Sequence, residues 1–114
     1  MGRRGGVASR IARGDVRLYR FAPPDKERPV VILTRDTAIR HLTRVTVAPI
    51  TSTLRDVPSE VALGVDDGMK QLCAVNLHNV VTVAQQNVGR RVAQLSPQKM
   101  SAICAAWRFA VGCD

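Results

Sequence analysis

The chain has 114 residues, of which 46% are hydrophobic and 23% charged, and its formal net charge is +8. This length predicts one domain, and this composition is typical of a folded globular protein rather than of a disordered chain. No apolar run approaches the roughly 20 residues that a membrane-spanning helix needs, and the N-terminus lacks the apolar core of a secretory signal. We therefore expect a cytoplasmic protein that does not insert into membranes.

Arginine carries most of the positive charge. Fourteen of the 17 cationic residues are Arg, and the lysines are Lys26, Lys70 and Lys99. A guanidinium presents a planar fork of donors that fits phosphate oxygens, so this excess favours nucleic acid as a partner. A basic surface attracts acidic proteins equally well, and an arginine bias of the genome would give the same count.

The cysteines and histidines are not spaced as metal ligands. Cys73, Cys104 and Cys113 are odd in number and form no C-x-x-C pair, and the chain has two histidines. This pattern predicts neither a zinc site nor a disulfide framework. We expect no metal and no cofactor.

The N-terminal third begins with a basic segment and continues as a strand. Residues 1–13 hold four arginines and three glycines without hydrophobic periodicity, which predicts a flexible arm ahead of a domain over residues 14–114. Residues 16–21 alternate as in a half-buried strand, with Arg17 on the face opposite Val16. Residues 22–27 contain two prolines and three charges and predict an exposed loop.

Short apolar and β-branched runs predict the remaining strands. The pair 72–77 and 80–83 is interpreted as one strand with a bulge at His78-Asn79. Between the strands, residues 34–43 predict a short helical turn, and Asp66-Asp67-Gly68 predicts a tight turn. The predicted strands cover residues 29–33, 45–50, 59–63, 72–77 with 80–83, and 91–95.

One helix closes the chain. Ser96 is a good N-cap, Pro97 suits the first helical position, and Gly112 is a natural stop. Six or seven short strands with this helix predict a mainly β, α+β fold, a small, strongly bent antiparallel sheet or half-open barrel. The apolar stripe of the helix consists of Met100, Ile103, Cys104, Trp107 and Val111.

Two of the predicted strands carry groups suited to phosphodiester chemistry. Arg28 stands at the start of one strand, and Thr51, Ser52 and Thr53 follow the end of another. An arginine can hold two phosphate oxygens at once, and hydroxyls can donate hydrogen bonds to phosphate or to a nucleophile. Ordinary turn chemistry, in which Ser and Thr bond the local backbone, is the alternative for the hydroxyls.

His78 is the histidine with a candidate role. It stands between Leu77 and Asn79 at the predicted kink, where a side chain can be redirected toward a groove, and an imidazole is a natural proton shuttle. A purely structural role is the alternative. His41 falls in a polar stretch and is expected to be exposed.

Three motifs together resemble the MazF/PemK family of toxin endoribonucleases. They are Gly14-Asp15-Val16, then Arg28-Pro29-Val30-Val31-Ile32-Leu33, and Val47-Ala48-Pro49-Ile50-Thr51-Ser52. The resemblance covers roughly residues 14–111. It implies a dimeric, SH3-like β-barrel that cuts single-stranded RNA along its dimer interface. The implied cleavage proceeds without metal, by attack of the 2'-hydroxyl, and leaves a 2',3'-cyclic phosphate.

The resemblance also implies roles for individual residues and a partner. Arg28 and Thr51 fall on catalytic positions, with Ser52 next to Thr51 at the phosphate. The implied partner is an antitoxin whose acidic, disordered tail covers the basic groove, in line with the charge of +8.

One segment departs from the family pattern. Many members have an acidic residue followed by Gln where this chain has His78-Asn79, and in some members an arginine takes the place of Asn76. We therefore treat Ser52, Thr53, Asn76, His78 and Asn79 as candidates for RNA binding or catalysis.

Two other functions fit the same fold. A sister family with this barrel poisons gyrase, and the pairing of Arg28 with Thr51 argues against that activity. A non-catalytic SH3-like module that binds RNA or protein is the other alternative, because the acidic family position is filled by His78.

Overall fold

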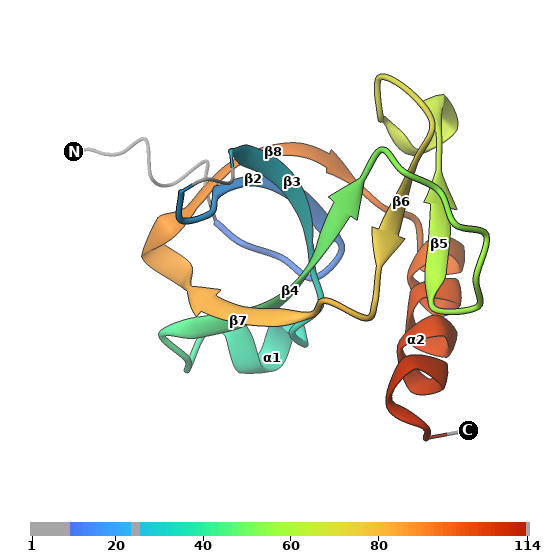
Figure 1. Ribbon diagram of the computed structural model, residues 1–114. Coiled ribbons are helices and arrows are strands. Elements are labelled where there is room, and N and C mark those ends of the chain that lie inside the picture. The colour runs from blue at the N-terminus through green and yellow to red at the C-terminus, as the bar shows by residue number, and fades with distance from the viewer. Residues whose placement is uncertain (1–9, 24–25, 114) are drawn as a thin grey trace.

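The predicted strands form one antiparallel sheet in a computed structural model that describes residues 10–23 and 26–113. The sheet has seven strands in the order β5-β6-β4-β3-β2-β8, with β7 pairing with β4 off this path (Figure 1). Residues 1–9 of the predicted basic arm lie outside the described residues. The strands are β2 (Asp15–Arg20), β3 (Glu27–Ile32), β4 (Arg44–Thr51), β5 (Glu60–Leu63), β6 (Cys73–Asn76), β7 (Val81–Ala84) and β8 (Val88–Gln94).

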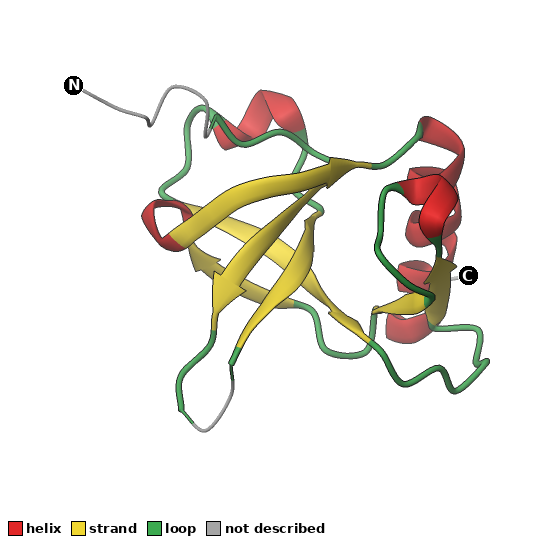
Figure 2. Cartoon of the chain, turned by 90° about the horizontal axis from the view of Figure 1, so that it is seen from above, coloured by secondary structure: helices red, strands yellow, loops and turns green. Residues whose placement is uncertain are grey.

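Strand β4 joins the two parts of the sheet because it is long enough to pair with two strands on one edge. Its C-terminal residues Ile50 and Thr51 pair with β6, and its N-terminal half pairs with β7. The predicted single strand with a bulge at His78-Asn79 is therefore two strands, separated by a turn that follows β6. The strand path bends sharply between them, and the sheet curls into a half-open barrel, as Figure 2 shows from above.

The central strands are buried on both faces. In β3, Val30 and Ile32 belong to a core cluster inside the curled sheet, whereas Val31 belongs to a second cluster under the terminal helix. This explains why β3 and the middle of β4 are continuous apolar runs rather than alternating ones. The inner cluster is closed by α1 (Asp36–Ile39), the helical turn predicted within residues 34–43.

Helix α2 (Pro97–Val111) begins and ends as the sequence predicts. The Ser96 hydroxyl accepts a hydrogen bond from the Lys99 amide at 3.1 Å, and Gly112 adopts a left-handed conformation at φ 77°. Ile103 is fully buried, and the helix packs beside the β5–β6 hairpin (Figure 1). The predicted stripe was wrong at its last position, because Val111 is 60% exposed where the helix extends past the sheet.

The alternation predicted for β2 was also wrong. Arg17 is fully buried, as is Asp15, and the Arg17 Nη1 lies 2.9 Å from the Asp15 Oδ2. Burying one charge here is tolerated because its counter-charge is buried with it. Short 3-10 turns occupy Val65–Asp67 and Gln85–Asn87. Within the described ranges, no helix combines the length and apolarity required to cross a bilayer.

Candidate active site

Arg28 and Thr51 stand at the same end of the β3–β4 pair. The pairing runs from Ile32 with Val47 to Val30 with Pro49, so Arg28 precedes and Thr51 follows the paired residues at one end of the sheet. Both residues line one cleft of about 750 Å³, together with Ser52 and Thr53.

Thr51 has one of its lone pairs already occupied. The Thr53 amide donates to the Thr51 Oγ1 at 3.1 Å, which is the local turn bond typical of Thr and Ser after a strand. A hydroxyl that accepts one bond still has its own hydrogen to donate. The turn therefore fixes the Thr51 oxygen at the cleft and leaves it able to donate to an anion.

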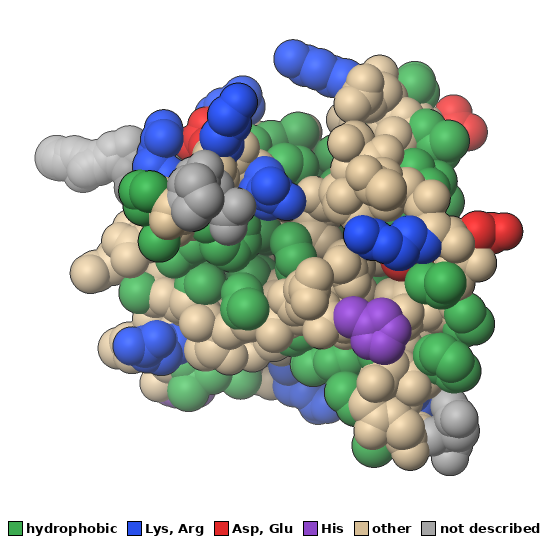
Figure 3. All heavy atoms as spheres, viewed as in Figure 1, with side chains coloured by type: hydrophobic (Ala, Val, Ile, Leu, Met, Phe, Trp, Pro, Cys, Tyr) green, Lys and Arg blue, Asp and Glu red, His purple; other side chains and the backbone are tan. Residues whose placement is uncertain are grey.

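Further cations surround the cleft. Lys26, Lys70 and Arg90 line it with Arg28, and among the described lining residues Glu27 contributes one carboxylate. In Figure 3, Lys and Arg side chains gather over this end of the molecule with hydrophobic side chains between them. Sequence reasoning missed Lys70 and Arg90, because Lys70 comes from the loop before β6 and Arg90 from β8, and only the tertiary structure brings both to the cleft with Arg28.

The rest of the cleft is largely apolar. Its apolar surface can pack against a sugar or a base while the surrounding cations bind the phosphates. Burial, and to a smaller extent the nearby Asp67 carboxylate, raises the pKa of the Cys73 thiol above 9.0, so this thiol is neutral at physiological pH. The apolar lining consists of Leu18, Pro29, Ile50, Met69, Cys73 and Val92.

The other candidate residues form a separate group. The His78 amide donates to the Asn76 side-chain oxygen at 2.9 Å, and the Asn79 amide donates to the Asn76 carbonyl at 3.4 Å. This turn follows the end of β6, whose first residue Cys73 lines the cleft, so Asn76 is displaced from it by roughly 10 Å along the strand. His78 is exposed there and is not among the residues that line the cleft, and His41 is exposed as expected.

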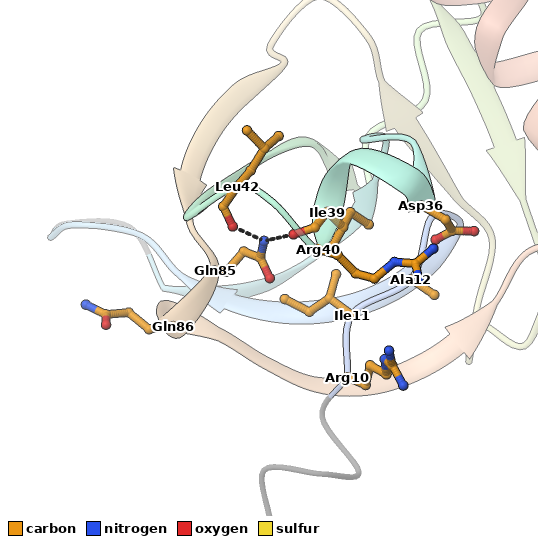
Figure 4. A pocket seen from close by; sticks show the side chains of 9 residues that line it. All are labelled: Arg10, Ile11, Ala12, Asp36, Ile39, Arg40, Leu42, Gln85 and Gln86. Carbon is orange, nitrogen blue, oxygen red and sulfur yellow. Dashed lines mark hydrogen bonds between the residues drawn. The ribbon is translucent and has the colours of Figure 1, made fainter.

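A second pocket, of about 730 Å³, opens beside α1 (Figure 4). Gln85 closes one side of it by donating to the carbonyls of Ile39 at 2.8 Å and Leu42 at 2.7 Å. These bonds satisfy the carbonyl of the last residue of α1 and one in the turn after it, so Gln85 has a structural role. Arg10, Arg40 and Asp36 are the charged residues of this pocket, and its described lining holds no hydroxyl side chain, so the cleft at Arg28 is the candidate active site.

The described residues contain no group of three or more His, Cys, Asp or Glu side chains placed to hold a metal ion. The cleft itself offers guanidinium, ammonium, hydroxyl and carboxylate groups, together with the Gln71 amide and the Cys73 thiol.

Comparisons with known proteins identify the family of the chain. The sequence profile described as "PemK-like, MazF-like toxin of type II toxin-antitoxin system" matches residues 12–110. The chain is 42% identical to a probable endoribonuclease MazF5 of Mycobacterium tuberculosis, over 90% of this chain and 94% of that one.

Two solved structures are similar over nearly their whole lengths. The M. tuberculosis toxin MazF-mt6 is 35% identical with a TM-score of 0.80, covering 88% of this chain and 98% of the toxin. An endoribonuclease from a mycobacterial species, in complex with its cognate antitoxin, is 26% identical with a TM-score of 0.81, covering 92% and 98%. These matches confirm the predicted mainly β, half-open barrel with a C-terminal helix. The chain belongs to the PemK-like, MazF-like toxin family of type II toxin–antitoxin systems.

Proposed function

We propose that this protein is a toxin that cleaves single-stranded RNA at the cleft between Arg28 and Thr51. The observation that carries the proposal is the cleft that Arg28 and Thr51 line together, with four cations and one carboxylate among its described lining residues. Relatives named as endoribonucleases in the same family support it. An apolar floor with cations around it suits a strand whose bases are unstacked and whose phosphates are accessible.

The proposed reaction is an attack of the 2'-oxygen on the adjacent phosphorus. The 2'-hydroxyl gives up its proton to solvent as the new P–O bond closes a 2',3'-cyclic phosphate, and the bond to the 5'-oxygen breaks as that oxygen takes up a proton from solvent. Negative charge accumulates on the non-bridging oxygens, and Arg28 can hold two of them through its fork while remaining protonated. Thr51 donates a hydrogen bond from its hydroxyl to the same phosphate. Ser52 and Thr53 bind the RNA strand next to that phosphate.

We assign His78, Asn76 and Asn79 to RNA contact rather than to proton transfer. Their turn lies beyond the far end of β6 from the cleft, so they suit nucleotides that flank the cleaved bond. The guanidinium and hydroxyls at the cleft act on phosphate without a metal ion, so the proposed reaction needs none.

Two partners complete the proposal. An antitoxin is the first, since a homologous endoribonuclease has been solved with its cognate antitoxin, and an acidic segment would compete with RNA for the basic cleft. A second copy of the chain is the other, because Phe109 is 47% and Val111 60% exposed on α2, and a two-fold interface would cover such apolar surface. A monomer in sedimentation at micromolar concentration would contradict the dimer.

The test of the activity compares Arg28 variants on mixed RNA in excess EDTA, with the cut ends sequenced and assayed for 2',3'-cyclic phosphate. Arg28→Ala should lower the rate by about 10² to 10³, as for loss of one donor to a developing charge. Arg28→Lys should recover only part of the lost rate, because an ammonium cannot make the bidentate hydrogen bonds of a guanidinium to phosphate.

The matched control is Arg44→Ala, which removes the same charge at the opposite end of β4, roughly 23 Å from Thr51. It should cut at the parent rate. Cleavage by Arg28→Ala at the parent rate would disprove the site, and loss of cleavage in EDTA that Mg²⁺ restores would disprove the metal-independent reaction. RNA binding without any cleavage by the parent protein would favour the non-catalytic module.

A further inference from the structure

The pairing of β8 with β2 is interrupted by two register shifts, next to the residues of β8 that line the cleft. The pairing runs Val16 to Ala93, then Arg17 to Arg91, then Tyr19 to Val88, so β8 has one extra residue in each interval. In the first interval the extra residue is Val92. In the second, one residue of β2, Leu18, lies opposite two residues of β8, Gly89 and Arg90. Such bulges redirect side chains next to functional sites. Here Arg90 and Val92 both line the cleft that holds Arg28.

A buried hydrogen-bond network holds this part of β8 in place. The Arg17 Nε donates to the Gly89 carbonyl at 2.8 Å, and the same guanidinium is paired with Asp15. On the other side of the bulges, the Gln94 side chain donates to the Asp15 Oδ1 at 2.6 Å. Both ends of the irregular segment are thus fixed to one fully buried ion pair.

Gly89 shows how closely the two strands approach. A Cβ at this position would lie 2.8 Å from the Leu18 carbonyl oxygen, a backbone atom that cannot swing away. Any side chain at position 89 would therefore push β8 from β2 and move the residue that follows it. The position of Arg90 therefore depends on the close approach of the Gly89 backbone to Leu18.

We infer that Arg90 is a second phosphate-binding residue of the active site, placed in the cleft by the bulged segment of β8 and by the buried Asp15–Arg17 pair. The inference rests on the proposed RNA cleavage and assigns Arg90 to a phosphate next to the one that reacts. Strand β2 lies between β3 and β8, so the backbones that carry Arg28 and Arg90 are about 10 Å apart. Two guanidinium groups on either side of Leu18 suit successive phosphates of one strand, with the apolar floor under the nucleotide between them.

Arg90 and Arg91 differ in what their guanidinium groups can bind. The Arg91 guanidinium lies 3.9 Å from the Asp15 Oδ1, so its charge is directed to the buried carboxylate. Arg90 is exposed at the cleft, where its charge is available to a polyanion. Arg17 acts through Gly89 and is a positioning residue.

The test measures binding of a fully 2'-O-methylated single-stranded RNA of the cleaved sequence, which has no nucleophile, as a function of salt. Each phosphate contact to a single strand contributes about 0.7 to the slope of log K against log salt. Arg90→Ala should reduce the slope by about 0.7, and on cleavable RNA it should raise KM far more than it lowers kcat. Arg90→Lys should keep the slope, because it keeps the charge. Arg44→Ala should leave the slope at the parent value.

Gly89→Ala tests the positioning without changing any charge. If it remains folded by circular dichroism, it should lose the same part of the salt slope as Arg90→Ala. A parent-like slope in Arg90→Ala would overturn the phosphate contact, and a parent-like slope in folded Gly89→Ala would overturn the role of the bulge. Either result with intact Arg28-dependent cleavage leaves the proposed function standing, whereas a parent protein that neither binds nor cuts RNA removes both.

Discussion

The buried Asp15–Arg17 pair should be a main determinant of stability, which Arg17→Met would test. Methionine keeps much of the buried volume and removes the charge and the donors. The substitution leaves the fully buried Asp15 carboxylate without its 2.9 Å partner and removes the donors to the carbonyls of Gly89, at 2.8 Å, and Arg10, at 3.1 Å.

The expected cost is large relative to the stability of a domain. Breaking a buried pair by removing one partner costs about 3 to 5 kcal/mol, against a total of about 5 to 15 kcal/mol for a typical domain. Asp15 keeps hydrogen bonds from the Ala12 amide at 3.1 Å and from Gln94 at 2.6 Å, and the exposed Arg91 guanidinium stays 3.9 Å from its Oδ1. These bonds place the expected loss near the lower end, at about 3 kcal/mol.

Urea denaturation followed by circular dichroism measures this loss. With a slope of about 1.5 kcal/mol per molar urea, the midpoint of Arg17→Met should fall by roughly 2 M. Arg20→Met removes an exposed arginine at the end of the same strand and should change the free energy of unfolding by no more than about 0.5 kcal/mol. The double variant Asp15→Asn with Arg17→Met should lose less free energy of unfolding than the two single variants summed, because it no longer buries a carboxylate that lacks Arg17. Equal midpoints for Arg17→Met and Arg20→Met would refute the reasoning.

Three further predictions concern single side chains. Ser59 is fully buried, and its hydroxyl has no hydrogen-bond partner among the described residues, so Ser59→Ala should leave the free energy of unfolding unchanged or raise it by about 1 kcal/mol; a clear loss in urea denaturation would contradict this. Because the folded state holds the Cys73 proton more tightly than the unfolded state, the contribution of this thiol to stability should be constant below the ordinary thiol pKa of 9.0 and fall as pH rises above it. Cys73→Ala should reduce the loss of stability above that pH, and an unchanged pH dependence would disprove the assignment. His78→Ala should weaken RNA binding or change the cut sequence with an unchanged pH profile of the rate; parent-like cutting with a much lower melting temperature would show a structural role instead.

Local sequence patterns determined the elements whose signals are local. Helix α2 was predicted at both ends, because Ser96 and Gly112 act on the backbone groups nearest to them. Strands β3 and β4 were predicted from continuous apolar runs. These runs are continuous because both faces of each strand are buried. The pairing of these two strands brings Arg28 and Thr51 to one end of the sheet, and the chemical roles of both residues are proposals.

Only the tertiary structure decided what depends on contacts distant in the sequence. Arg17 was expected on an alternating face, and it is buried because Asp15 and the Gly89 carbonyl meet it there. Arg90 reaches the cleft through bulges in β8, which no local pattern marks, because a bulge is a property of how two strands pair. His78 was expected at a kink near the groove, and the division of its strand into β6 and β7 sets it in a separate turn. Alternation along a strand can be read from sequence, whereas the register of its partners is fixed only when the sheet closes around the core.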